Sequence, residues 1–195
     1  MKPPKLALSL FAALTLLAGG CSQQSSTDTA TTTATKPAQP YEAVAAQGKG
    51  FTVGAVMSAN TVYVLFDPQC PHCGHLWEAS VPLLKKVKFV WIPVAIMGGK
   101  STPQGAALLA AANPAELMAE HEKSVLAGTG GIAASANIPA ELEQAIQKNT
   151  QLFNSLGVDS VPYILARNTR TGQVVTNNGA LSTPALAEFL GLEQP

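Results

Sequence analysis

The residues best suited to chemistry are the two cysteines of the segment Cys70-Pro71-His72-Cys73. Pro71 suits the first position of a helix, where its missing N–H costs nothing, so we expect a helix to begin at Cys70. The two sulfur atoms then lie one helical turn apart and can reach one another. Unpaired N–H groups and the helix dipole would stabilise a Cys70 thiolate, and they lower the pKa of such cysteines to ~3.5–7.5. The pattern predicts a redox pair in which Cys70 attacks and Cys73 resolves the mixed disulfide.

His72 stands between the two cysteines and, like the helix terminus, is expected to lower the pKa of Cys70. A cationic imidazole, or one that donates a hydrogen bond to the Cys70 sulfur, lowers the pKa of that thiol further. A stabilised thiolate is both a nucleophile toward disulfides and a good leaving group, and it makes the disulfide an oxidant.

Other uses of a C-x-x-C pair fit less well. A zinc site would need further ligands, and only His75 and His121 are available. Haem attachment requires a histidine directly after the second cysteine, where this chain has Gly74. A structural disulfide would close too small a loop to stabilise a domain much. We expect no cofactor and no bound metal. A metal-handling protein that holds copper or zinc with Cys70, Cys73 and His75 stays open as the alternative function.

The elements that position the cysteines follow from the hydrophobic pattern. The run Thr61–Phe66 is apolar at nearly every position, which is typical of a central strand covered on both faces. Pro82 is expected to kink the helix that follows the cysteines. Pro93 is expected to require a gap in the pairing of the next strand. Further along, the pattern predicts strands at 88–96, 161–166 and 174–176 and helices at 101–112, 114–126, 139–156 and 182–190.

The order of these elements constrains the sheet. Strand, helix and strand in succession predict a parallel pair with a right-handed crossover. The last two strands are joined by a tight turn at 170–173 and predict an antiparallel hairpin. Asn113 before Pro114 is a candidate helix cap, and the glycines of 128–131 indicate a flexible joint.

Composition excludes some functions. Of the 195 residues 47% are hydrophobic and 12% charged, so disorder over the whole length is not expected. Twelve Lys and Arg balance twelve Asp and Glu, which leaves no basic excess for a phosphate backbone. We therefore expect no nucleic-acid partner.

Residues 1–20 have the pattern of an export signal. Lys2 and Lys5 precede an apolar stretch, 6–17, that is shorter than the ~20 residues needed to cross a bilayer. The segment 17–21 resembles the lipobox of bacterial lipoproteins, in which the cysteine, here Cys21, becomes the lipidated first residue. The alternative is ordinary signal cleavage that leaves Cys21 as a free thiol. Both place the mature chain outside the cytoplasm, where disulfides persist.

A tether and one domain follow the signal. Residues 21–40 comprise Cys21 and a stretch rich in Ser, Thr and Gln, without the aromatic or branched aliphatic residues needed for a core. We expect a flexible tether with a reach of about 25 Å and a folded domain at 41–195. The lipid on Cys21 would hold this domain at a membrane of the periplasm.

Two segments resemble the periplasmic thiol:disulfide interchange proteins, in particular the catalytic domain of DsbG and DsbC. Residues 62–77 are similar to the active-site segment, and residues 157–163 to the segment that carries a cis proline. The resemblance implies an α/β thioredoxin fold with a helical insertion, at about 100–156, between the second strand and the cis-proline strand. It also implies that Val161 and Pro162 bind the substrate chain, that protein thiols and disulfides are the substrates, and that a membrane redox partner resets the active site.

The sequence also departs from that family. Only residues 41–59 precede the first clear strand, which is too short for the family's dimerisation module, so we expect a monomer. Val161 and the Pro-His dipeptide look more like the oxidase DsbA. Thioredoxins and DsbA keep a buried acid six residues before the first cysteine, where this chain has Val64. Proton transfer to Cys73 would then use water or Glu78. The direction of electron flow stays open.

Overall fold

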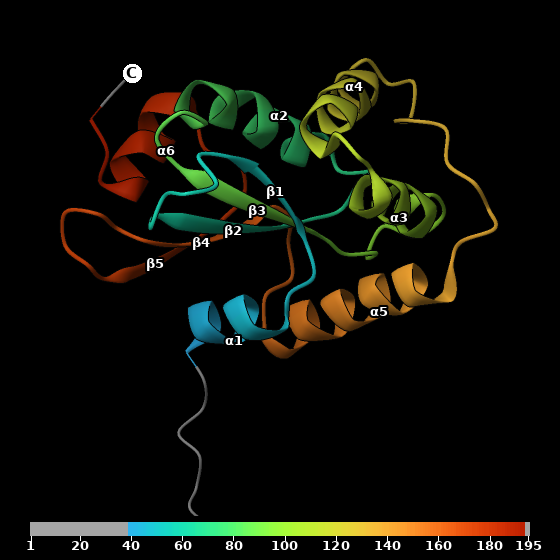
Figure 1. The fold of residues 1–195 in the computed structure, drawn as a ribbon, viewed down its shortest axis with the longest axis horizontal. Coiled ribbons are helices and arrows are strands. Elements are labelled where there is room, and N and C mark those ends of the chain that lie inside the picture. The colour runs from blue at the N-terminus through green and yellow to red at the C-terminus, as the bar shows by residue number, and fades with distance from the viewer. Residues whose placement is uncertain (1–38, 194–195) are drawn as a thin grey trace, which may run out of the picture. The chain divides into compact units, whose positions relative to one another are not determined.

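The computed structural model describes residues 39–193. The predicted signal peptide, Cys21 and nearly all of the predicted tether lie outside these residues. Within them, one sheet has the strand order β1-β3-β2-β4-β5 (Figure 1). Its strands are β1 (Phe51–Gly54), β2 (Thr61–Phe66), β3 (Lys88–Pro93), β4 (Tyr163–Arg167) and β5 (Val174–Asn178). β2 and β3 are parallel and the other pairs are antiparallel, which confirms the predicted parallel pair and the predicted hairpin.

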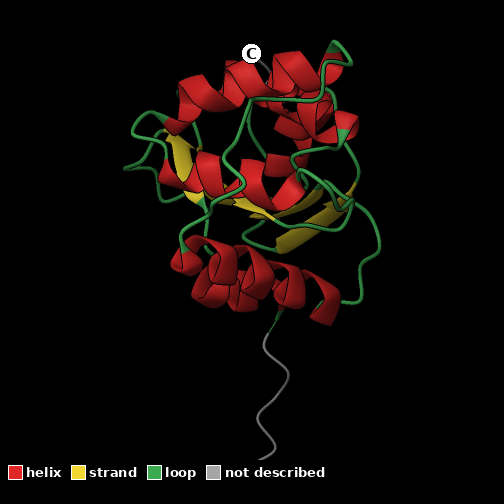
Figure 2. Cartoon of the chain, turned by 90° about the vertical axis from the view of Figure 1, so that its right-hand side faces the viewer, coloured by secondary structure: helices red, strands yellow, loops and turns green. Residues whose placement is uncertain are grey.

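Helices cover both faces of the sheet (Figures 1 and 2). α1 (Pro40–Gln47) and α5 (Ala140–Ser155) lie on one face, and α2 (Pro71–Ser80) and α6 (Thr183–Leu190) on the other. α4 (Pro114–Leu126) packs beside α2, and α3 (Ser101–Ala110) contacts both α4 and α5. The helices α3 to α5 form the insertion between β3 and β4, as the resemblance implied.

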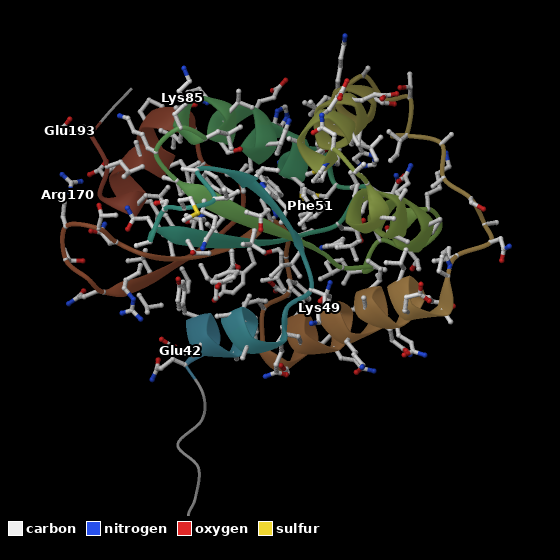
Figure 3. All side chains as sticks on the ribbon, in the orientation of Figure 1. Glu42, Lys49, Phe51, Lys85, Arg170 and Glu193 are labelled. Carbon is white, nitrogen blue, oxygen red and sulfur yellow. The ribbon has the colours of Figure 1, made fainter. Side chains whose placement is uncertain are left out.

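The central strand is buried because its side chains are apolar on both faces. Phe66 packs edge-to-face on Phe51 and on Trp91, with ring centroids 6.1 and 5.4 Å apart. Trp77 of α2 packs on the same Trp91 at 5.5 Å and belongs to the core. Charged side chains such as Lys85 lie at the periphery, whereas Phe51 is enclosed (Figure 3). These aromatic contacts fix α2, and with it the cysteines, to the sheet.

Pro82 and Pro93 lie at the ends of regular elements and not inside them. Helix α2 ends at Ser80, and Pro82 belongs to a following 3₁₀ turn, Val81–Leu83, so the expected kink is wrong. The reason is that proline lacks the N–H needed for the next α-helical hydrogen bond, and the chain continues from Ser80 into a 3₁₀ turn. Pro93 is the last residue of β3, so the predicted gap in the pairing is not needed.

Two elements before β2 were not predicted. Phe51 and Val53 of β1 are buried and pair antiparallel with β3. α1 has eight residues, of which only Val44 is buried. Both elements are too short to give a clear periodic pattern. The other predicted bounds are confirmed to within about two residues, except that β3 is shorter and that α2 ends at Ser80, before the proline that it was expected to contain. The Asn113 side chain accepts a hydrogen bond from Glu116 N as predicted.

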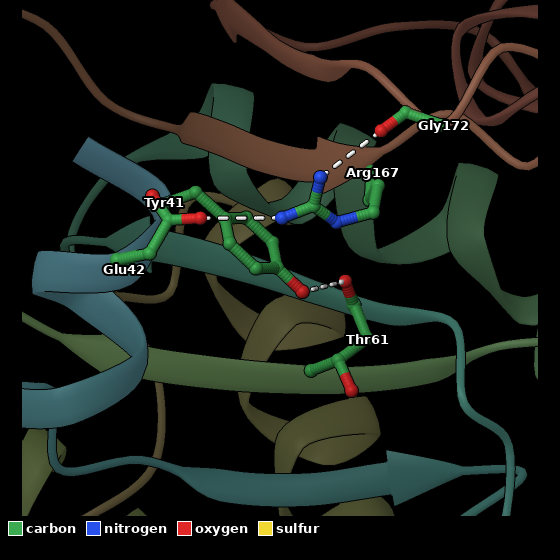
Figure 4. Close-up of polar contacts among 5 residues, drawn as sticks. All are labelled: Tyr41, Glu42, Thr61, Arg167 and Gly172. Carbon is green, nitrogen blue, oxygen red and sulfur yellow. Dashed lines mark hydrogen bonds and ion pairs between the residues drawn. The ribbon is translucent and has the colours of Figure 1, made fainter. Parts of the chain in front are cut away.

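Arg167, the last residue of β4, attaches α1 to the sheet (Figure 4). Its guanidinium donates to Glu42 Oε1 at 3.2 Å and to the Gly172 carbonyl at 3.0 Å. It also lies 5.5 Å from the centre of the Tyr41 ring. The Tyr41 hydroxyl donates to the carbonyl of Thr61 at 3.3 Å. These contacts add to the packing of Val44, the buried residue of α1.

Among residues 39–193, none of the helices combines the length and the hydropathy that a membrane crossing requires.

Candidate active site

The cysteine pair lies where β2 passes into α2. Cys70 is the residue before the first turn of α2, and its N–H donates to the Asp67 carbonyl at 2.9 Å. Pro71 begins the helix, as the sequence predicts. The N–H groups of Cys73 and Gly74 donate to the Cys70 carbonyl at 3.0 and 3.4 Å. The two cysteines therefore lie on successive turns at the positive end of the helix.

Cys70 and Cys73 are free thiols with opposite acidity. The hydrogen bond from the Cys73 thiol is the largest effect that lowers the pKa of Cys70, from 9.0 to about 6. Burial opposes this, and the backbone N–H groups of Cys73 and His72 and the charge of His72 add to it. Burial, followed by the bond to Cys70, raises the pKa of Cys73 well above its usual value. One sulfur is thus ionised at neutral pH and the other carries the proton.

The loop before β4 closes over the first cysteine. The Val161–Pro162 peptide bond is cis, and both side chains are buried. The Cys70 thiol contacts the Val161 carbonyl at 3.6 Å, although the two residues are far apart in the sequence. The structure therefore brings together the sulfur and the proline loop that the sequence predicted as one site.

Asp67 organises the turn that leads to Cys70. This buried carboxylate accepts hydrogen bonds from Gln69 N and Ser101 Oγ at 2.9 and 2.6 Å. Its other oxygen accepts from the N–H groups of Ile96 and Met97 at 2.8 and 2.9 Å. A single side chain thus fixes the β2–α2 turn, the loop after β3 and the start of α3 relative to one another.

The helical insertion also contacts this turn. His121 of α4 is fully buried; its Nε2 lies 2.7 Å from the Pro68 carbonyl and its Nδ1 accepts from Ile132 N at 3.2 Å. These partners require the proton on Nε2, and burial lowers the pKa of His121, so the ring is neutral. Gln69 and Gln104 bond to each other and both donate to the Gly130 carbonyl. Both ring nitrogens of His121 thus contact backbone groups, which connects α4 to the β2–α2 turn and leaves neither nitrogen free to bind a metal.

Glu122, the next residue of α4, is a buried carboxyl that the sequence analysis did not single out. It is 1% exposed, and neither oxygen has a hydrogen-bond partner among the described residues. Burial is the main cause that raises its pKa from 4.5 to about 9, and the charges of Cys70 and Asp67 add to it. Sequence gave no signal, because the residue lies some fifty positions from the cysteines on an otherwise ordinary amphipathic helix.

The remaining predicted residues lie on the surface of α2. Pro71 and His72 are exposed beside Cys70. His75 and Glu78 are exposed too, with His75 Nδ1 and Glu78 Oε2 3.9 Å apart. Within residues 39–193, no three His, Cys, Asp or Glu side chains come together to hold a metal ion. The copper or zinc alternative thus gains no support from the arrangement of Cys70, Cys73 and His75.

The sheet, the helices on both faces and the cis proline beside the cysteine pair define a thioredoxin-like fold. A periplasmic thioredoxin-like protein from Salmonella enterica serovar Typhimurium has the same fold, with a TM-score of 0.61 at 16% identity over 80% of this chain and 97% of that protein. No family model matches the chain.

The sequence is DsbG-like. It is 33% identical over 140 residues to the thiol:disulfide interchange protein DsbG of Pseudomonas aeruginosa, which covers 71% of this chain and 54% of that protein. It is 30% identical over 105 residues to DsbG of Escherichia coli, covering 53% of this chain and 42% of that protein. The chain therefore spans about half the length of the curated relatives it matches.

Proposed function

We propose that this chain is a periplasmic thiol:disulfide oxidoreductase that acts on protein substrates through Cys70-Pro71-His72-Cys73. The observation that carries the proposal is the division of acidity between the sulfurs: the pKa of Cys70 falls to about 6 while that of Cys73 rises. At pH 7 about nine-tenths of Cys70 is then thiolate. The similarity to DsbG supports the same activity.

In the oxidising direction, a substrate thiolate attacks Cys70 Sγ of the Cys70–Cys73 disulfide. The bond between the two sulfurs breaks, and Cys73 leaves with the electron pair. A second substrate thiolate then attacks the substrate sulfur that is bonded to Cys70. This releases Cys70 as a stabilised thiolate and oxidises the substrate by two electrons.

In the reducing direction, the Cys70 thiolate attacks a substrate disulfide. One substrate sulfur leaves as thiolate, and Cys73 then attacks Cys70 Sγ and displaces the other. The chain ends oxidised by two electrons. Stabilisation of the Cys70 thiolate favours the dithiol form and therefore favours oxidation of substrates.

The proposed substrate site is the loop of Val161 and Pro162. The Val161 carbonyl oxygen lies 3.6 Å from Cys70 Sγ. An extended substrate chain that pairs with this loop would therefore bring a substrate sulfur close to Cys70. His72 is exposed beside the sulfur, and we assign it the role of stabilising the thiolate, because its charge and its N–H both lower the pKa of Cys70.

We also propose that the mature chain is held at a membrane by a lipid on Cys21, acts as a monomer and is reset by a membrane redox partner. The support is the N-terminal sequence pattern: a signal-like segment, a lipobox-like cysteine and a polar tether. Replacement of Cys21 by Ser should release the mature protein from the membrane fraction into the soluble periplasm. Retention of that variant in the membrane fraction would refute the anchor.

The activity is tested with the chain lacking its signal segment and carrying Cys21→Ser, which leaves only the proposed redox pair. Equilibration with glutathione mixtures should give one two-electron transition between dithiol and disulfide. Cys70→Ser should abolish oxidation and reduction of model substrates, and Cys73→Ser should accumulate a mixed disulfide at Cys70. Retained turnover in Cys70→Ser would overturn the proposal.

A further inference from the structure

Glu122 of α4 is the one buried carboxyl near the cysteines whose charge nothing in the described residues balances. Both of its oxygens lack a hydrogen-bond partner there, although the residue is only 1% exposed. A buried polar group without a partner costs free energy. A proton on the carboxyl removes most of that cost, and burial raises the pKa of Glu122 to about 9 accordingly.

The position of Glu122 places its carboxyl against the active-site helix. α4 packs beside α2, as Figure 1 shows. At Gly74, directly after the resolving cysteine, an added Cβ would lie only 2.9 Å from Glu122 Oε2. A side chain at position 74 would displace the carboxyl, so the glycine creates the space that the carboxyl occupies next to Cys73.

The titratable groups that face Glu122 are few. From the active-site turn and α2 they are Asp67, Cys70 and Cys73. His121, its neighbour on α4, is neutral and bonds to Pro68. Asp67 is saturated by four hydrogen bonds. Among residues 39–193, only Glu122 combines proximity to both sulfurs with two oxygens that lack a hydrogen-bond partner.

We propose that Glu122 is the proton acceptor and donor for Cys73 during disulfide exchange. This proposal rests on the proposed function, which does not name the group that takes and returns the proton of Cys73. It replaces Glu78, which the sequence suggested for this role but whose side chain is 65% exposed and points its carboxylate toward His75.

In the reducing direction the mixed disulfide at Cys70 has consumed the thiolate, so the negative charge that opposed ionisation of Glu122 is gone. Loss of that charge lowers the pKa of Glu122, although burial, the main cause, still raises it. The fraction of the carboxyl that has released its proton to solvent is the base. It then takes the proton of Cys73 as Cys73 Sγ attacks Cys70 Sγ. The Cys70–Cys73 bond forms, the bond to the substrate sulfur breaks, and the substrate leaves as thiolate with the electron pair.

In the oxidising direction the steps reverse. The substrate thiolate attacks Cys70 Sγ, the bond between the two cysteines breaks, and Cys73 leaves with the electron pair. The protonated Glu122 carboxyl gives its proton to the Cys73 sulfur, which would otherwise be left as a buried anion. No oxidant or reductant beyond the substrate is required.

The test separates the two half-reactions in the Cys21→Ser chain. Glutathione disulfide reacts with Cys70 to give a mixed disulfide, which Cys73 then resolves; both are followed by acid quenching and mass spectrometry from pH 5 to 10. The attack step is measured alone with Cys73→Ser in the background. The variants are Glu122→Gln, which cannot carry the proton, Glu122→Asp, which can, and the exposed control Glu78→Gln.

We expect Glu122→Gln to slow resolution at pH 7 by at least about tenfold, since proton transfer by a positioned group contributes typically 10²–10⁴-fold. The resolution rate of Glu122→Gln should then rise steadily with pH, while the rate of attack by Cys70 should change by less than about twofold. Glu122→Asp should restore part of the resolution rate, and Glu78→Gln should resolve the mixed disulfide as fast as the parent. An unchanged resolution rate and pH profile in Glu122→Gln overturns the proposal. Failure of Cys70 to form the mixed disulfide would instead overturn the proposed function.

A second measurement needs no substitution at Glu122. In the reduced chain, the carboxyl ¹³C resonance of Glu122 should titrate well above pH 7. It should titrate at lower pH in Cys70→Ser, where the thiolate charge is removed. A Glu122 that is ionised throughout pH 5–9 in both proteins contradicts the assignment.

Discussion

Glu122→Gln should change how the stability of the reduced protein depends on pH. The folded pKa of Glu122 is about 9 against 4.5 for the free carboxyl, chiefly because of burial. Its contribution to stability is fully present below pH 4.5 and is lost as pH rises toward 9, at about 1.4 kcal/mol per pH unit. Between pH 5 and pH 8 this amounts to about 4 kcal/mol, a large part of the ~5–15 kcal/mol that stabilises a typical domain.

The Cys70 thiol acts in the opposite sense and hides this loss in the parent protein. Its pKa is lowered from 9.0 to about 6, so its contribution is present above pH 9 and lost as pH falls through 6. The amide of Glu122→Gln does not titrate, so the variant retains the rises due to Cys70 and to His121, whose pKa is lowered by burial. The difference between the two proteins isolates Glu122.

The assay is urea unfolding in the presence of a reductant, followed by the fluorescence of the buried tryptophans at pH 5 and pH 8. The stability of Glu122→Gln relative to the parent should rise by several kcal/mol between these two pH values. Glu116→Gln, an exposed change on the same helix, should follow the parent within about 0.5 kcal/mol. If Glu122→Gln also follows the parent at both pH values, the carboxyl is ionised in the fold and the reasoning fails.

Two further predictions concern the sulfur and its turn. Alkylation of Cys70 by iodoacetamide should show a midpoint near pH 6, and a midpoint near 8.5 in the parent protein would contradict the geometry. His72→Ala should move the midpoint slightly upward, because it removes the imidazole charge that lowers the pKa of Cys70 while it keeps the backbone N–H. Asp67→Ala leaves four hydrogen-bond donors without their acceptor, so it should lower the free energy of unfolding by about 2–4 kcal/mol in urea and slow disulfide exchange. A loss below about 0.5 kcal/mol would show that water replaces the carboxyl group as the acceptor.

The elements that carry strong local patterns could be predicted. Thr61–Phe66 is a central strand because its residues are apolar on both faces, and α4 has the bounds that its cap and periodicity indicate. Phe51 and Val53 alternate with exposed residues, but four positions are too few to distinguish a strand from a loop. The kink expected at Pro82 is wrong because a proline can either bend a helix or end it, and the sequence pattern alone does not distinguish the two.

The candidate site divides in the same way. Cys70 and Cys73 are three positions apart at the start of a helix, so helix geometry places them together. The approach of Val161 to Cys70 followed only from a resemblance, since nothing local in residues 157–163 indicates what they face. His121 and Glu122 could not be predicted, because their roles depend on how the insertion folds back on the β2–α2 turn.

Two buried carboxyls near the cysteines have opposite roles because of their partners. Asp67 accepts hydrogen bonds from Gln69 N, Ser101 Oγ and two further N–H groups, which fix its carboxyl group in one position. Glu122 receives no such bonds among residues 39–193, so burial raises its pKa and the charge of Cys70 raises it further. In this chain Val64 occupies the strand position at which thioredoxins carry their acid, and in the proposed proton route the inserted helix α4, which packs beside α2, supplies an acid instead. Gly74 makes that possible, because any larger residue there would place its Cβ within 2.9 Å of the Glu122 carboxyl and of Leu126.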